Sequence, residues 1–250
     1  EKNLVIPQVY KKLFSKMASF TISNSDILRA VSSSTEEQAL SFDPSKKVVR
    51  FPAWVDFEIF SNVKPLRNNE KNFKILFIGS VTDRKKPHLI VEAMNNFNSK
   101  DIKLYIVGPT PNENYLSQLK KLVQEYDLVD QVSFTGSIDR KSVMDHYADT
   151  NLMILPSVSE GLARVIFESQ VTACPVLVTD APGMGDIVID GQTGYIFESD
   201  NLESLTSKIQ EIKNNYQDAI HVGNNAKNFI LSNYSADNFK FSFKKLFDAV

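Results

Sequence analysis

Two glutamates eight positions apart, Glu160 and Glu168, are the residues of this sequence best suited to chemistry. A short buried-strand pattern, Asn151–Leu155, precedes them, and an amphipathic pattern begins at about residue 161. This order predicts Glu160 at a strand-to-helix turn and Glu168 about two helical turns further on, roughly 12 Å along the axis. A carboxylate beside the free N–H groups of a helix start suits a ligand that carries hydroxyls and phosphate. The alternative is that Glu160 only caps the helix and Glu168 lies on a solvated face.

A second cluster of functional side chains, residues 79–87, joins the first strong strand pattern to its helix. Lys85 and Lys86 lie at the predicted helix start, where the helix dipole favours anions over cations. A phosphate bound there would explain both lysines, and a solvated charge run is the alternative. A third cluster, Asp180–Asp186, contains two glycines, but the dinucleotide fingerprint is incomplete and the chain has no Gly-x-x-x-x-Gly-Lys loop. NAD binding and P-loop chemistry are therefore disfavoured.

The elements that must position these clusters repeat regularly from residue 73 onward. Strand-length apolar runs alternate with helix-period segments, which is typical of a parallel, doubly wound α/β sheet buried on both faces. The predicted strands span 73–78, 102–107, 132–134, 152–155 and 176–178, and the predicted helices span 87–97, 113–126, 139–148 and 161–173. Three strands end in glycine, at Gly79, Gly108 and Gly136. Tight turns explain each glycine singly, but together they predict one ligand-facing rim at the carboxyl ends of the strands.

The first 60 residues lack this regular alternation and are too few to bury a core of their own. We expect helices over 8–17 and 25–40, short strands over 19–22 and 48–51, and a polar linker over 61–71. The first helix is basic because it carries Lys11, Lys12 and Lys16. We interpret its basic face as solvated, with an anionic membrane surface as the alternative partner.

Composition limits the remaining function classes. The 250 residues are 42% hydrophobic and 23% charged, as expected of a globular chain with one large domain or two small ones. The net charge of −2 argues against a general nucleic-acid-binding protein. The single cysteine, Cys174, lies in an apolar run and is expected to be buried, and the histidines lack metal-ligand spacing, so no metal is expected. No signal peptide or apolar run of membrane-span length is visible, so we expect a cytoplasmic protein.

The order of these motifs resembles the donor-binding half of a retaining glycosyltransferase of group 1, or family 4, with the GT-B fold. The resemblance runs from about residue 46 to the end of the chain. It rests on Gly79, Lys85, Gly108, Gly136, Pro156-Ser157, Glu160-Gly161 and Glu168, followed by Pro175-Val176, Gly183, Asp186, Asp190-Gly191 and Gly194. It implies the tail of an acceptor domain with a crossover linker over 1–60, a Rossmann-like donor domain over 61–235, and a helix over 236–250 that returns to the acceptor domain. Most of the acceptor domain would then lie outside this chain, which begins with Glu, and the chain alone is expected to be incomplete for activity.

The resemblance also implies a reaction and a role for individual residues. A hexosyl group would pass from a nucleotide-diphosphate sugar to an unknown acceptor, in glycan, polysaccharide or glycolipid synthesis, without a metal or other cofactor. The implied catalytic residues are Lys85, which would neutralise the diphosphate, and Glu160, which would hold the donor sugar, while Glu168 would bind the ribose. The rest of the implied donor site comprises Gly161, Leu162 and Ala163 beside the phosphates, Gly79 and Ser80 after the first strand, and Gly108, Pro109, Gly136 and Ile138 around the base.

The chain departs from the family at one phosphate-binding position. Ser80 stands where arginine is usual, and Arg84 is the nearest substitute. A non-catalytic nucleotide-sugar-binding module or inactive scaffold is therefore an alternative to the enzyme, and an unrelated doubly wound nucleotide-binding enzyme is a third hypothesis. The expected partners are a nucleotide-sugar donor and a sugar or lipid-linked acceptor, with no nucleic acid. The inner face of a membrane is a candidate for peripheral contact.

Overall fold

The structure is a computed structural model that describes residues 8–67, 72–97 and 99–248. The chain divides into two compact units. The larger unit is Val55–Asn233, and the smaller unit combines Glu1–Trp54 with Tyr234–Val250.

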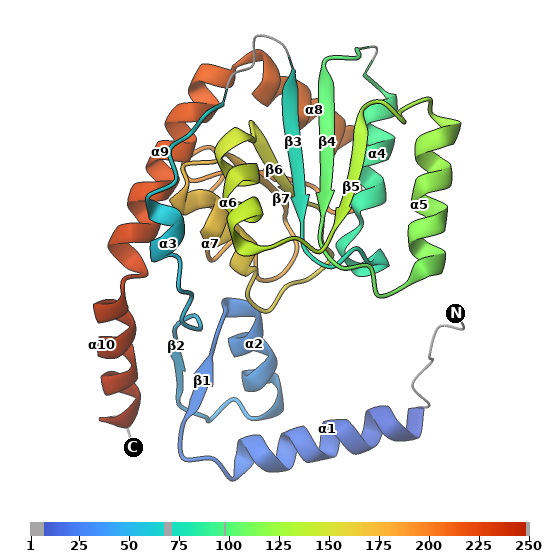
Figure 1. Cartoon of the computed structure of the whole chain (residues 1–250). Coiled ribbons are helices and arrows are strands. Elements are labelled where there is room, and N and C mark those ends of the chain that lie inside the picture. Colours follow the sequence, from blue (N-terminus) through green and yellow to red (C-terminus); the bar gives the residue numbers. More distant parts are fainter. Residues whose placement is uncertain (1–7, 68–71, 98, 249–250) are drawn as a thin grey trace. The chain divides into compact units, whose positions relative to one another are not determined.

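The larger unit contains a six-stranded parallel sheet with the strand order β5-β4-β3-β6-β7-β8 (Figure 1). Its strands are β3 (Phe73–Ile78), β4 (Ile102–Val107), β5 (Val132–Gly136), β6 (Leu152–Leu155), β7 (Val176–Thr179) and β8 (Tyr195–Phe197). The predicted doubly wound parallel sheet is therefore confirmed. The strand β8 was not predicted, because three residues are too few to show a period.

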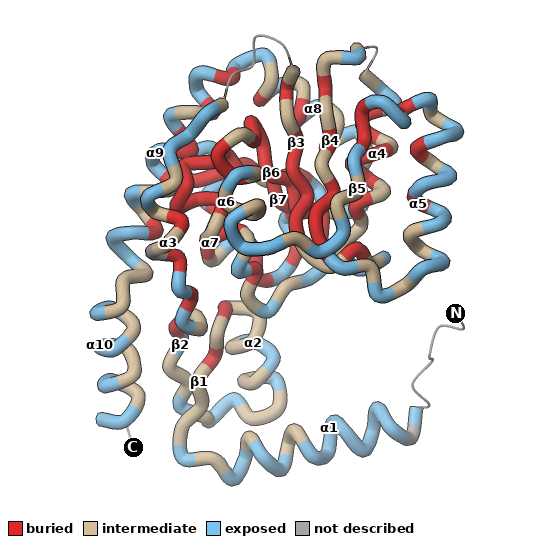
Figure 2. Tube along the Cα trace, in the orientation of Figure 1, coloured by how far each residue is buried: buried red, intermediate tan, exposed pale blue. Residues whose placement is uncertain are grey.

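Helices cover both faces of this sheet. The helices of the larger unit are α3 (Glu58–Ser61), the short 3₁₀ helix η1 (Asp83–Lys85) in the connection after β3, α4 (Pro87–Asn95), α5 (Glu113–Glu125), α6 (Arg140–Asp149), α7 (Arg164–Val171), α8 (Leu202–Asn214) and α9 (Tyr216–Asn233). The helix α4 packs against α5 and α8, while α7 packs against α9 and α3. In Figure 1, α6 lies in front of the sheet and α4 behind it. Every residue of β6 and β7 is buried, and Figure 2 shows the buried segments concentrated in the strands. This burial explains their continuous apolar sequences.

The order of the strands creates a switch point between β3 and β6. From β3 the chain winds outward through β4 to β5, and then it returns across the sheet to β6 on the other side of β3. The connections that follow β3 and β6 therefore leave the same edge of the sheet side by side, and such a crevice is where open α/β sheets bind ligands. These two connections carry Lys85 and Glu160 respectively.

The smaller unit contains α1 (Gln8–Ser23), β1 (Leu28–Ala30), α2 (Ser33–Phe42), β2 (Val48–Arg50) and α10 (Ala236–Phe247). The strands β1 and β2 pair in parallel, with Leu28 opposite Val48. On α10, the ring of Phe243 lies edge-on to Phe51 with the two centroids 5.2 Å apart. This aromatic contact attaches the last helix to the end of β2.

Among the described residues, no helix is long and apolar enough to cross a membrane.

Two predictions for the smaller unit are wrong. Residues 19–22, expected as a strand, belong to α1, and residues 25–40, expected as one helix, contain β1 and the start of α2. A capping box explains the second error. The Ser32 hydroxyl accepts a hydrogen bond from the Thr35 N–H, and the Thr35 hydroxyl accepts one from the Ser32 N–H. This box begins the helix only at residue 33, so the preceding residues remain extended and pair with β2.

Candidate functional site

Three glycines shape the rim of the sheet at the ends of β3, β4 and β5. Gly79, Gly108 and Gly136 have φ angles of 139°, 136° and 66°, which disfavour any residue with a side chain. The Gly79 N–H donates to the Val107 carbonyl and the Gly108 N–H to the Gly136 carbonyl, both at 2.9 Å. A Cβ atom at Gly108 would lie 2.1 Å from the Gly79 carbonyl oxygen, so the two strand ends approach this closely only with glycine. The three predicted rim glycines therefore lie together.

The two lysines after β3 diverge. Lys85 ends η1, and its side chain, which is 13% exposed, passes over Gly79 and reaches the β6–α7 connection. Lys86 has a left-handed backbone with φ of 46° and precedes Pro87, the first residue of α4. Its ammonium group bonds to Asp200 instead. The left-handed turn thus directs only Lys85 into the candidate site.

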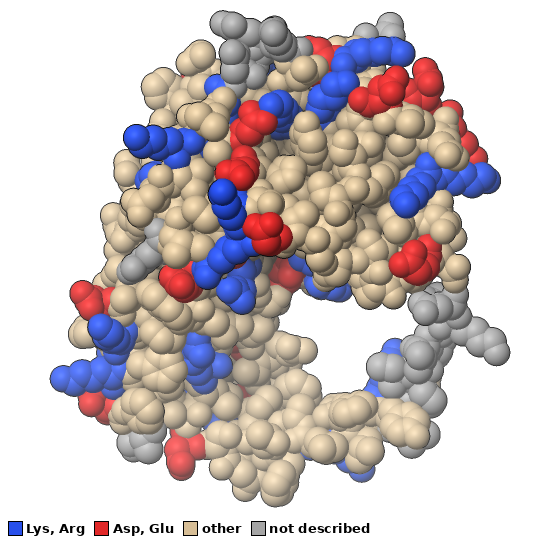
Figure 3. Space-filling model, in the orientation of Figure 1, with Lys and Arg blue, Asp and Glu red and all other residues tan. Residues whose placement is uncertain are grey.

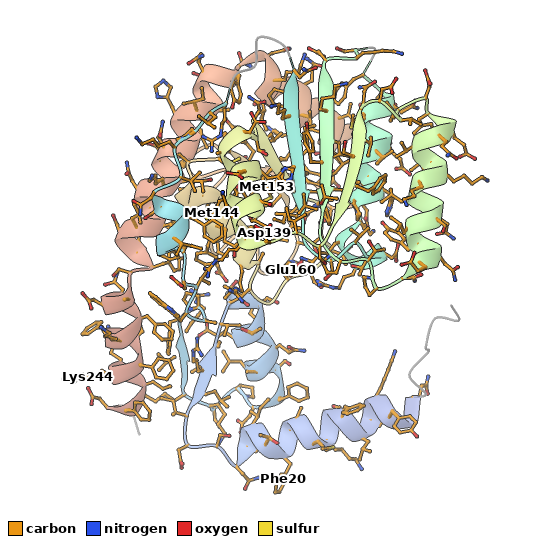
Figure 4. The ribbon with its side chains drawn as sticks, in the orientation of Figure 1. Phe20, Asp139, Met144, Met153, Glu160 and Lys244 are labelled. Atoms are coloured by element: carbon orange, nitrogen blue, oxygen red, sulfur yellow. The ribbon has the colours of Figure 1, made fainter. Side chains whose placement is uncertain are left out.

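Glu160 is the centre of a cluster of charged and polar groups. Its Oε1 atom accepts a hydrogen bond from the Ser157 hydroxyl at 2.9 Å and lies 3.2 Å from Lys85 Nζ and 3.3 Å from Arg84 Nη1. The Glu160 side chain is only 9% exposed. Figure 4 labels Glu160 at the end of the sheet to which the strand arrows point. The N-cap position of α7 is occupied by Ala163, and no side chain makes a capping hydrogen bond there. Glu160 is therefore not a helix cap.

The backbone of Glu160 is held by the loop that follows β7. The Glu160 N–H donates to the Pro182 carbonyl at 3.2 Å. Gly183 has φ of 91°, and a Cβ atom there would lie 1.9 Å from the Glu160 carbonyl oxygen. Glycine is therefore required where this loop supports the candidate site.

Arg84 connects the loops after β3 and β6. Its carbonyl oxygen accepts the Val158 N–H at 3.1 Å, and its guanidinium group donates to the Ser159 carbonyl. Two cations, Arg84 and Lys85, thus approach one carboxylate, and the cluster carries a surplus positive charge. A bound anion would be attracted to this surplus.

Free backbone donors adjoin this cluster at the start of α7. Within the described ranges, no hydrogen bond uses the N–H groups of Gly161, Leu162 or Ala163. Gly161 is exposed and Leu162 is half-buried, while Ala163 is buried. Unpaired N–H groups before a helix, next to a lysine, suit an anion such as a phosphate.

Glu168 lies one turn into α7 and has a different environment. It is half-buried, and the fully buried Tyr147 hydroxyl on α6 donates to its Oε2 atom at 3.2 Å. Burial raises the pKa of the Glu168 carboxyl, an effect opposed by the Tyr147 hydrogen bond and by Arg164 and Arg140. Glu168 is therefore not on a solvated face. In the part of the chain that the structure describes, no hydrogen bond or ion pair joins it to Glu160.

The remaining predicted site residues lie along the rim. Ser80 is half-buried directly after Gly79, and the next N–H, of Val81, donates to the Pro109 carbonyl at 2.9 Å. Pro109 is exposed and Ile138 is half-buried, after β4 and β5 respectively. The connections after β3 and β4 are thus joined directly by one hydrogen bond.

Sequence reasoning missed three contributors: the hydroxyl of Ser157, the hydroxyl of Tyr147 and the backbone of Gly183. Ser157 lies in a recognised motif three residues before Glu160, so a hydrogen bond between the two side chains could have been predicted from the sequence. Tyr147 lies 21 positions before Glu168 on another helix, and no local pattern connects them.

Metal ions require a set of ligand side chains that converge on one point. Among the described residues, no group of three or more His, Cys, Asp and Glu side chains is arranged to hold a metal ion. On the face drawn in Figure 3, acidic and basic side chains are interspersed rather than gathered into a single basic area.

The sequence matches a known family over most of the larger unit. The family model described as glycosyl transferases group 1 matches residues 58–229. The capsular polysaccharide biosynthesis glycosyltransferase CapM of Staphylococcus aureus is 25% identical over 175 residues, which cover 66% of this chain and 43% of that protein. The GDP-mannose-dependent alpha-(1-6)-phosphatidylinositol monomannoside mannosyltransferase of Mycolicibacterium smegmatis is 22% identical over 228 residues, which cover 84% of this chain and 59% of that protein. The chain spans about half the length of these curated relatives.

Solved structures share the fold. Anabaena HepE in complex with UDP-glucose superimposes with a TM-score of 0.83 and 15% identity over 98% of this chain and 70% of that chain. Sucrose-phosphate synthase from Thermosynechococcus elongatus gives a TM-score of 0.83 and 22% identity over 96% of this chain and 63% of that chain. At such identities the likeness concerns the fold.

Proposed function

The chain belongs to the group 1 glycosyl transferases, and from this premise we propose that it forms the donor-binding half of a retaining glycosyltransferase. The transferred group is a hexosyl residue of a nucleotide-diphosphate sugar, and the acceptor belongs to glycan, polysaccharide or glycolipid synthesis. The observation that carries the proposal is the contact of Lys85 and Arg84 with the carboxylate of Glu160, at the switch point of the sheet.

The diphosphate is proposed to bind at Lys85 and at the free N–H groups of residues 161–163. During transfer the bond between the sugar carbon and the phosphate oxygen breaks, and its electron pair remains on the phosphate. Positive groups that are already in place stabilise this developing charge, each contact contributing about 3 kcal/mol by analogy with oxyanion holes. The acceptor oxygen forms the new bond on the same face of the sugar, and its proton passes to the departing phosphate oxygen. The proposed reaction uses no metal, because Lys85 and the N–H groups of residues 161–163 supply the positive charge.

The carboxylates are assigned to the hydroxyls of the donor. Glu160, which Ser157 and the two cations hold in place, accepts hydrogen bonds from the sugar. Glu168 accepts hydrogen bonds from the hydroxyls of the ribose. The base is assigned to the rim of Gly108, Pro109, Gly136 and Ile138. Guanine and uracil are both candidates for the base, because the name of one relative specifies GDP-mannose and a structural neighbour is in complex with UDP-glucose.

A second function is favoured by Ser80. This side chain is uncharged at the position where the family resemblance implies a second phosphate cation. A protein that binds nucleotide sugars without transferring them would tolerate this loss, so a non-catalytic binding module is the alternative. Arg84 lies in the adjacent turn and makes the enzyme the better-supported proposal.

Calorimetric titration of the chain with UDP, GDP, ADP and their common sugar conjugates tests the donor site. We expect saturable binding of one nucleotide series, weakened at least tenfold by Glu168→Ala, which corresponds to about 1.4 kcal/mol. Binding of none of these compounds would refute the donor site in this chain. Transfer itself is tested by release of the nucleoside diphosphate from the matching donor in a protein that also carries an acceptor domain, and its absence there would favour the non-catalytic alternative.

A further inference from the structure

Among the described residues, Tyr147 is the largest fully buried side chain, and its hydroxyl contacts Glu168 of the candidate site. It lies on α6, and its ring is fixed edge-on against Phe60, with the two centroids 5.7 Å apart. Its hydroxyl points toward α7, where it lies 3.2 Å from Glu168 Oε2 and 3.3 Å from the Val165 carbonyl oxygen. A tyrosine has one O–H to donate, and the charged carboxylate is the stronger acceptor.

The two oxygens of the Glu168 carboxylate are therefore not equivalent. Oε2 is bound from the interior by Tyr147. In the described residues no hydrogen bond uses Oε1, and Oε1 is not among the buried polar atoms that lack a partner. Oε1 is consequently not fully buried. One oxygen is bound from the interior by Tyr147, and the other keeps its hydrogen-bonding capacity for a ligand.

We propose that Tyr147 is a positioning residue for the ribose: by binding Oε2 it sets the rotation of the Glu168 carboxylate and presents Oε1 to the vicinal hydroxyls. This inference rests on the proposed function, since it presumes that Glu168 meets a ribose. Each carboxylate oxygen has two acceptor sites, so the Tyr147 hydrogen bond leaves enough capacity for two ribose hydroxyls.

The same hydrogen bond has an electrostatic role. Burial raises the pKa of Glu168, whereas the hydrogen bond from Tyr147 and the positive charges of Arg164 on α7 and Arg140 on α6 lower it. Tyr147 does not lose its own proton in exchange, because burial and the neighbouring carboxylate hold the pKa of its hydroxyl well above the usual value. Removing the hydroxyl therefore leaves the carboxylate less ionised in mildly acidic solution, as well as free to rotate.

The test compares ribose recognition by the unmodified chain and by Tyr147→Phe, which keeps the ring and removes only the hydroxyl. Two ligands are used: whichever of UDP, GDP and ADP binds most tightly, and the 2′,3′-dideoxy analogue of that nucleotide. Their affinities are measured by calorimetry at pH 5.5 and pH 7.5. For the unmodified chain we expect a preference of tenfold or more for the ribose form. Tyr147→Phe should lower this preference at least threefold, more strongly at pH 5.5, while affinity for the dideoxy analogue stays within twofold.

Two variants serve as controls. Tyr216→Phe removes a hydroxyl from another buried tyrosine, which packs on Phe73 at the amino end of β3, and it should leave the preference unchanged. Glu168→Gln should abolish the preference, and adding Tyr147→Phe to it should change nothing further. A merely structural role of Tyr147 would instead weaken both ligands equally and would not depend on pH.

The outcomes separate this inference from the proposed function. If Glu168→Gln abolishes the ribose preference but Tyr147→Phe retains it at both pH values, the role of Tyr147 is refuted and the donor site stands. If Glu168→Gln also retains the preference, the assignment of Glu168 to the ribose is refuted, and the role of Tyr147 with it. Binding of none of the three nucleotides would refute the donor site itself. Should Tyr147→Phe fail to fold, ¹³C NMR of the unmodified chain decides, because the Tyr147 Cζ resonance must then titrate with the same midpoint as the Glu168 carboxyl. A Cζ resonance that ignores that midpoint would overturn the inference.

Discussion

Lys85 Nζ lies 3.2 Å from Glu160 Oε1, so the candidate phosphate-binding cation is paired with the candidate sugar-binding carboxylate. The pair is largely shielded from solvent, with the two side chains 13% and 9% exposed. Arg84 joins the same oxygen at 3.3 Å. A phosphate that enters this site must therefore compete with Glu160 for both cations, and a donor sugar must compete with the cations for Glu160.

This competition predicts opposite effects for two ligands in Glu160→Gln. Gln keeps the size of the side chain but releases Lys85 and Arg84, so we expect a bare nucleoside diphosphate to bind at least twofold more tightly. The sugar conjugate should lose at least fivefold relative to the bare diphosphate, because a carboxylate accepts sugar hydroxyls better than an amide. Calorimetry with both ligands measures the ratio. Parallel weakening of the two would mean that Glu160 acts only as structural support.

The divergence of the two lysines allows a matched pair of variants. Lys85→Ala should weaken nucleoside diphosphate binding tenfold or more, about 1.4 kcal/mol, because it removes the cation at the rim. Lys86→Ala removes the same charge from the next residue, whose ammonium group pairs with Asp200, and should change affinity less than twofold. Equal losses in both variants would indicate a general effect of net charge, and the assignment of Lys85 would then be wrong.

Two glycines of one loop provide a test of the support behind Glu160. At Gly183 a Cβ atom would lie 1.9 Å from the Glu160 carbonyl oxygen and φ is 91°, so Gly183→Ala should destabilise the fold by about 2 kcal/mol or more. It should also weaken binding of the sugar conjugate. At Gly185 a Cβ atom meets nothing within 4 Å, so Gly185→Ala should leave the free energy of unfolding within about 1 kcal/mol. Urea denaturation monitored by circular dichroism gives both values. A Gly183→Ala variant as stable as Gly185→Ala would contradict the close approach.

The larger unit could be predicted from the sequence because its strands are buried on both faces. Runs such as residues 152–155 are wholly apolar, and this signal does not depend on distant partners. The same applies to the rim, since the glycines end their strands in the sequence itself. Pairings such as Tyr147 with Glu168 depend on how helices α6 and α7 pack, which no local period encodes.

The smaller unit was predicted less well for a related reason. Its two strands have three residues each, and at that length alternation of apolar and polar residues does not separate strand from helix. What decides the boundary is a pair of hydrogen bonds between Ser32 and Thr35. A serine followed three residues later by threonine indicates a helix start less clearly than a serine followed by the usual glutamate or glutamine.

Glu168 should impose a cost on stability that depends on pH. Its pKa in the folded chain is raised from the ordinary value of 4.5 by burial, so the folded state holds this proton more tightly than the unfolded state. Its contribution is therefore fully favourable below about pH 4.5 and is lost as the pH rises through the raised pKa. At neutral pH the charged, half-buried carboxylate disfavours folding.

Glu168→Gln should consequently be more stable than the unmodified chain at pH 7, and the gain should shrink toward zero as the pH approaches 4.5. Thermal unfolding at several pH values, without ligand, measures this difference in Tm. Glu125→Gln is the matched control, because Glu125 is an exposed partner of Lys121 and such pairs contribute about 0.5 kcal/mol or less. Its effect should not follow the same profile. If Glu168→Gln were less stable at pH 7, the hydrogen bond from Tyr147 would outweigh burial, and Glu168 would be a structural residue rather than one retained for a ligand at the expense of stability.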